Sequence, residues 1–103
     1  MTKPISDQAE VAVDFPGKTY MGSFTRHSSF DVSVDEDGVH IHLEHRVGEH
    51  RRVSFHIHHH LFADLIEEIG LALKEAQPLE KTERRRLADA AAVLQGAVDG
   101  SDR

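Results

Sequence analysis

The sequence predicts an α+β fold: an antiparallel β-meander of four to five strands, followed by two C-terminal helices packed on one face as a two-layer sandwich. Apolar and polar residues alternate between about residues 9 and 58, and turn residues separate the alternating runs. From about residue 60 the apolar period becomes about 3.6, as in a helix. At 103 residues and 39% hydrophobic content, we expect a single domain spanning 1–103.

The first hairpin is expected at the N-terminal end of the alternating region. Every second residue from Val11 to Phe15 is apolar, which predicts a strand over about 9–15. Pro16-Gly17 predicts a turn, because proline presets one central position and glycine accepts a positive φ at the next. The second strand is then expected over about 19–25.

Three further strands are expected from the same alternation. Apolar residues occupy every second position in 30–34, 39–43 and 53–57. The acidic run ending at Gly38 predicts a hairpin turn, and Gly48–His50 predicts the next reversal. Because these connections are short, neighbouring strands in sequence are expected to be neighbours in the sheet.

Two helices are expected over about 60–77 and 79–98. Pro78 separates them, because proline cannot continue a helix. Each segment carries an apolar stripe at helical spacing. The tail, 99–103, is expected to fray. The stripes consist of Phe62, Leu65, Ile66, Ile69 and Leu73 in the first helix and Leu87, Ala90, Ala91, Leu94 and Val98 in the second.

The composition excludes several classes of site. The chain has no cysteine, so disulfides, thiolate metal sites and cysteine nucleophiles are ruled out. The net charge is −6, and neither half is basic. No apolar run approaches the roughly 20 residues of a membrane span, and the N-terminus lacks a secretion-signal pattern, so a cytoplasmic protein without membrane association is expected. Protonating all nine histidines would change the formal charge from −6 to +3.

The histidines fall on the polar face of the predicted sheet. A three-residue connection over 48–50 places Ile41 opposite Ile57, so that the apolar sets of both strands share one face. This register puts His42 opposite His56 and His40 opposite His58 on the other face. The preceding hairpin brings Asp31 beside His42.

These residues form a candidate metal site with His40, His42, His56, His58 and Asp31 as ligands. Directly opposed residues have Cβ atoms about 4.5–5.5 Å apart, so two His-x-His pairs on adjacent strands can hold a divalent ion. Zinc, copper or nickel suits imidazole ligands. The alternative interpretation, that these histidines are polar filler on a solvated face, stays open. For His27, His45 and His50 a structural role is favoured.

The densest basic cluster does not indicate a nucleic-acid-binding site. Arg84-Arg85-Arg86 and Lys81 are interspersed with acidic residues and resemble a solvated helix face. The chain has only one tyrosine and five phenylalanines for base stacking. No phosphate-binding loop or nucleophile motif is present, so an enzyme is not expected.

The sequence therefore favours a small non-enzymatic binding or regulatory module with a histidine-rich sheet face that binds a divalent metal or senses pH. Two alternatives remain: a protein-interaction or inhibitory module, and a single-stranded nucleic-acid-binding regulator. Leu61, Leu71 and Ala72 lie partly outside the first helical stripe, so either the second helix or a second copy covers them. A homodimer is the preferred expectation.

Overall fold

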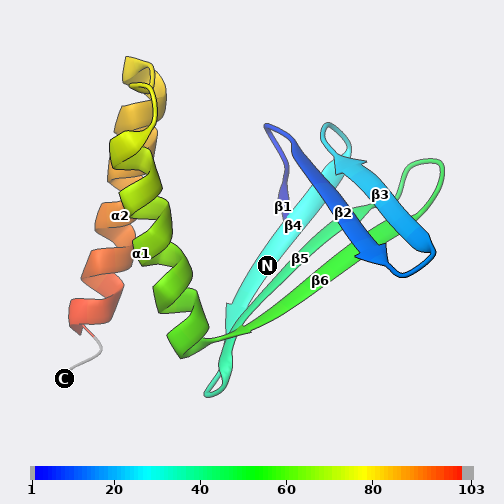
Figure 1. Cartoon of the computed structure of the whole chain (residues 1–103), viewed down its shortest axis with the longest axis horizontal. Helices are drawn as coiled ribbons and strands as arrows, with labels where there is room; N and C mark the ends of the chain where they lie inside the picture. Colours follow the sequence, from blue (N-terminus) through cyan, green and yellow to red (C-terminus); the bar gives the residue numbers. More distant parts are fainter. Residues whose placement is uncertain (1, 101–103) are drawn as a thin grey trace. The chain divides into compact units, whose positions relative to one another are not determined.

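A computed structural model describes residues 2–100 of the chain. Over this part, antiparallel strands come first and two helices follow, which confirms the predicted α+β class (Figure 1). The elements are β1 Lys3–Pro4, β2 Ala9–Phe15, β3 Lys18–Phe24, β4 Ser28–Val34, β5 Gly38–His45, β6 Arg51–His58, α1 His59–Glu75 and α2 Lys81–Gly100.

The strands divide between two sheets. A four-stranded sheet has the order β1-β4-β5-β6, while β2 and β3 form a separate hairpin. The expectation that every strand pairs with the next is therefore wrong between β3 and β4. Instead β1, which the sequence did not reveal, pairs with β4 through Lys3 opposite Phe30 and Pro4 opposite Ser29. Alternation identifies a strand but not its partner, and a two-residue strand is too short to show it.

The two turns on either side of β3 use positive backbone φ angles. Gly17 has φ 83° and closes the β2–β3 hairpin immediately after Pro16, as expected. His27 has φ 71°, in the turn before β4 where the Ser28 amide donates to the Thr25 carbonyl at 3.1 Å. His27 thus lies in a turn, and the structural role expected for it stays a prediction.

The pairing of β5 with β6 differs from the predicted register by two residues. Ile41 lies opposite Phe55, not Ile57, and His45 lies opposite Arg51. The connection is consequently five residues long, 46–50, and not three. A shift of two residues leaves every side chain on its predicted face, so hydrophobic alternation cannot detect it. By contrast, the predicted pairing of β4 with β5, including Asp31 opposite His42, is confirmed.

Little of the apolar surface is buried in the described residues. Phe24 and Val39 are the buried hydrophobic side chains, at 3% and 5% exposure. Ser28 is buried as well, and its Oγ hydrogen-bonds His45 Nδ1 at 3.0 Å. Several apolar side chains of the sheet remain exposed, including Val34 at 65%.

The helices lie close to their predicted positions. α1 ends three residues before Pro78, and α2 begins three residues after it. α2 includes positions 99 and 100, where the sequence predicts fraying, and 101–103 lie outside the described residues. Neither helix contains a buried residue. In the part of the chain that the structure describes, no helix is both long and apolar enough to cross a bilayer.

The chain forms two compact units, the first ending at Glu68 and the second beginning at Ile69. All six strands and the start of α1 belong to the first unit. The rest of α1 and α2 belong to the second. One domain over 1–103 and packing of both helices on the sheet stay predictions. The sites described below lie within the first unit.

Candidate metal-binding site

The polar face of the four-stranded sheet carries the histidines of β5 and β6. Side chains alternate across a strand, so His40 and His42 point to the same face of the sheet. The pairing of β5 with β6 places His56 and His58 on that face as well. His40 lies opposite His56, His42 opposite Ser54, and Gly38 opposite His58. The histidines therefore share one face, as predicted, but with different partners.

One carboxylate and two imidazoles form a group that could hold a metal ion. Asp35, His40 and His56 each offer a ligand atom, and these atoms lie within 4.8 Å of one another. His40 Nε2 donates a hydrogen bond to Asp35 Oδ2 at 2.8 Å. The rings of His40 and His56 stack with centroids 4.0 Å apart and an interplanar angle of 15°. The carboxylate stands 52% exposed and His40 27% exposed, so an ion can reach them from solvent.

The group needs modest rearrangement to bind zinc. Zinc–nitrogen bonds of about 2.0–2.1 Å in a tetrahedral site place the ligand atoms about 3.3 Å apart. The lone pairs of stacked rings lie in nearly parallel planes, so at least one ring must turn about χ2 to aim at a shared ion. His40 must also release its Nε2 proton or present Nδ1. These are side-chain rotations at a partly exposed site, with no change in strand pairing.

The turn between β4 and β5 fixes Asp35. Its Oδ1 accepts hydrogen bonds from the amides of Asp37 at 2.9 Å and Gly38 at 3.1 Å. The hydrogen bond from His40, together with these two amides, lowers the pKa of Asp35 from 3.8 to about 2. The carboxylate is thus ionised throughout the range in which imidazoles are neutral, as a metal ligand must be.

Two more histidines border the group. The ring centroid of His58 lies 4.8 Å from that of His56. His59, the first residue of α1, donates from Nε2 to the main-chain carbonyl of Asp35 at 3.1 Å. The end of β6 and the start of α1 are thereby brought to the same turn as the carboxylate.

Gly38 allows this close approach. A Cβ at this position would lie 2.2 Å from the carbonyl oxygen of Ile57 and 2.7 Å from the Cα of His58. Real Cβ atoms do not approach backbone so closely, and here the neighbour is not a flexible side chain. A residue without Cβ is therefore required where β5 meets β6 beside the histidines.

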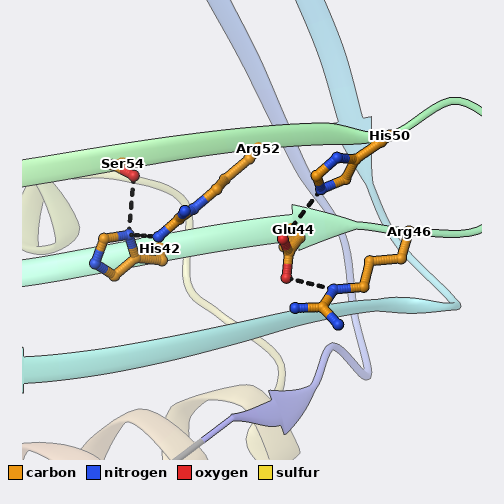
Figure 2. Close-up of polar contacts among 6 residues, drawn as sticks. All are labelled: His42, Glu44, Arg46, His50, Arg52 and Ser54. Atoms are coloured by element: carbon orange, nitrogen blue, oxygen red, sulfur yellow. Dashed lines mark hydrogen bonds and ion pairs between the residues drawn. The ribbon is translucent and has the colours of Figure 1, made fainter.

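Toward the other end of the same face, His42 is held by polar neighbours, as Figure 2 shows. Its Nδ1 accepts from Ser54 Oγ at 2.8 Å and from Arg52 Nη2 at 3.3 Å. A guanidinium can only donate, so His42 Nδ1 carries no proton and the neutral ring is protonated at Nε2. A cation at Nδ1 would have to displace both donors, one of which is itself positively charged.

Glu44 completes this second cluster (Figure 2). Its carboxylate accepts from Arg46 Nε at 2.8 Å and from His50 Nε2 at 3.1 Å, which ties the 46–50 connection to β5. The hydrogen bond from His50, followed by that from Arg46, lowers the pKa of Glu44. Both oxygens of this carboxylate are therefore occupied by donors.

The structure brings together only part of the predicted ligand set. His40 and His56 belong to the three-residue group, whereas His42, His58 and Asp31 lie outside it. Their role as ligands stays a prediction. Sequence reasoning did not propose Asp35, although a turn aspartate five residues before a predicted polar-face histidine was available as a signal.

In comparisons with known proteins, the chain matched no protein-family model, no curated protein and no solved structure.

Proposed function

We propose that this protein is a small non-enzymatic binding module that takes up a divalent metal ion at Asp35, His40 and His56. The observation that supports it most is the convergence of one carboxylate and two imidazoles with ligand atoms within 4.8 Å. Zinc, copper and nickel all suit this donor set. A ligand set with a single carboxylate and two imidazoles disfavours magnesium and calcium, which prefer oxygen ligands.

A binding role is favoured over catalysis by the position of the group. It lies on the exposed face of a sheet beside a turn, where water is not excluded from a bound ion or a substrate. An ion there would join the β4–β5 turn to β6, and His59 links the same turn to the start of α1. The metal would thus stabilise the β4–β5 turn, β6 and, through His59, the start of α1. This arrangement suits a metal-dependent regulatory response.

The module would also respond to pH. An imidazole binds a metal ion only in its neutral form. Acidification should therefore release the ion because protons compete at His40 and His56, while the carboxylate of Asp35 stays ionised.

The test is a zinc titration of the full-length protein by calorimetry, with paired variants from the two ends of the polar face. His56→Ala and Asp35→Asn should each weaken zinc binding by at least about tenfold. His42→Ala and Asp31→Asn are the matched controls and should leave the affinity nearly unchanged. Equal losses in both pairs would favour the ligand set predicted from sequence, and the absence of zinc binding by the wild type would remove the proposal.

Protein–protein binding is a second candidate function, supported by the exposed apolar side chains of α1. Leu61, Ile69 and Leu71 are 54%, 58% and 51% exposed, and the helix buries no residue. A homodimer is the simplest occupant consistent with these exposures. Native mass spectrometry across a range of concentrations tests it, and a monomer at all concentrations would count against it.

A further inference from the structure

A groove distinct from the histidine group lies between the β2–β3 hairpin and the start of β6. Its volume is about 560 Å³, within the usual range of about 300–1,000 Å³ for small-ligand sites. Figure 1 shows the hairpin crossing the end of the four-stranded sheet, and a hydrogen bond from Arg51 to the carbonyl of Ser23 joins the two.

The walls of the groove are partly apolar and open. Val13, Tyr20 and Met21 line it and are 37%, 55% and 78% exposed. Apolar side chains in a concave site contact the body of a ligand, and a few polar groups orient it. In this groove the hairpin supplies most of the apolar part, and Val53 of β6 adds to it.

Arg51 supplies the polar group. Its Nη2 donates to the Ser23 carbonyl at 3.2 Å, and its Cδ lies 3.6 Å from the point where a Cβ on Gly22 would be. Its Nε is buried and has no hydrogen-bond partner among the described residues. A buried donor without an acceptor destabilises the unliganded protein, because its hydrogen bond to water is lost on folding and no hydrogen bond within the protein replaces it.

The groove contains a cationic donor that lacks an acceptor among the described residues, which favours an anionic ligand. The guanidinium of Arg51 lies in the lining with the carboxylate of Glu49, whereas Arg52, which also lines the groove, donates from Nη2 to His42 Nδ1 on the histidine-bearing face. His50 also lines the groove, and its Nε2 already donates to Glu44. The feature of the lining that suits an anion is therefore the unused Nε–H of Arg51 and not a net positive charge.

We propose that this groove binds a small apolar carboxylate. The apolar body would lie against Val13, Tyr20 and Met21. The carboxylate would accept from Nε–H and an Nη–H of Arg51 after a small rotation of that side chain, giving the paired geometry for which a guanidinium is suited. This site is independent of the metal-binding proposal, because it shares no residue with the Asp35, His40 and His56 group.

The experiment compares octanoate with 1-octanol, which has the same number of carbon atoms but no charge. We expect octanoate to bind the full-length protein about tenfold more tightly or better, and ¹H–¹⁵N chemical-shift changes to be confined to the groove. Arg51→Met keeps most of the aliphatic stem and should abolish the preference for octanoate. Arg26→Met, an exposed arginine in the turn before β4, is the matched control and should retain the preference.

A second pair of variants guards against a folding defect at Arg51. Gly22→Leu should fill the groove and abolish octanoate binding, whereas the Cβ of Gly22→Ala would make ordinary contacts at 3.6 and 3.8 Å and should be tolerated. Circular dichroism checks that each variant is folded. Equal binding of octanoate and 1-octanol, unchanged binding by Arg51→Met, or shift changes scattered over the surface would each overturn the proposal.

Discussion

The two ends of the β5–β6 polar face have similar sequences but different chemistry. At one end His40 stacks on His56 and hydrogen-bonds Asp35, and these three residues present ligand atoms within 4.8 Å. At the other end His42 faces Ser54, and its Nδ1 accepts from both Ser54 and Arg52. Both histidines belong to the same His-x-His motif, so the motif alone does not distinguish them.

The difference lies in what each histidine meets across the strands. A second imidazole and a turn carboxylate offer lone pairs to a cation. A hydroxyl and a guanidinium offer hydrogen-bond donors, and the guanidinium adds positive charge. Cross-strand neighbours therefore decide whether an exposed histidine can act as a ligand or is held as part of a hydrogen-bonded surface.

The largest effect on this comparison is expected from Gly38→Ala. The added Cβ would clash with the backbone of Ile57 and His58, so strand pairing must shift at the Asp35 end of the face. We expect a loss of about 1–3 kcal/mol in the free energy of unfolding, measured by urea denaturation, together with weaker zinc binding. Gly70→Ala is the control, because its Cβ would meet nothing within 4 Å. That helical substitution should stabilise the protein by about 0.5–1 kcal/mol. If Gly38→Ala leaves the stability and the zinc affinity unchanged, the close approach of β5 to the backbone of Ile57 and His58 is contradicted.

An intermediate effect is expected from turning the second end into a copy of the first. Ser54→His combined with Arg52→Met places an imidazole opposite His42 and removes the guanidinium from its Nδ1. We expect a second, weaker zinc equivalent in a calorimetric titration. Ser54→Ala with the same Arg52→Met removes the donors without adding a ligand and should bind one zinc only. If the histidine variant also binds one zinc, the identity of the cross-strand neighbour is not what separates the two ends.

The smallest effect concerns stability at low pH. The pKa of Asp35 is lowered from 3.8 to about 2, chiefly by the hydrogen bond from His40. A depressed carboxyl pKa stabilises the folded state above the unfolded value, and this contribution is lost as the pH falls from about 4 to about 2. Asp35→Asn keeps the side-chain oxygen that accepts from the turn amides but removes the charge. We expect the wild type to have the higher urea midpoint at pH 5 and this advantage to disappear near pH 2. A difference that stays constant over this interval would show that ionisation of Asp35 does not contribute.

The amino-acid sequence by itself determined the order of β2 to β6 and of the two helices, and the face on which His40, His42, His56 and His58 lie. Alternation with period two fixed which side chains of β5 and β6 share a face, and the change to a helical period located α1 and α2 near Pro78. These are local properties, set by the sterics of the backbone and by the separation of apolar from polar residues.

Only the tertiary structure decided which residues meet. A two-residue shift of β6 leaves every side chain on the same face of the sheet, so the sequence could not choose between His42 and His40 as the partner of His56. It also could not show that Asp35 would lie beside His40 and His56. The five-residue connection held by Glu44, the absence of a Cβ at Gly38 and the pairing of β1 with β4 are consistent with the observed arrangement. Contacts between residues distant in sequence depend on this strand register and chain path, which hydrophobic periodicity leaves undetermined.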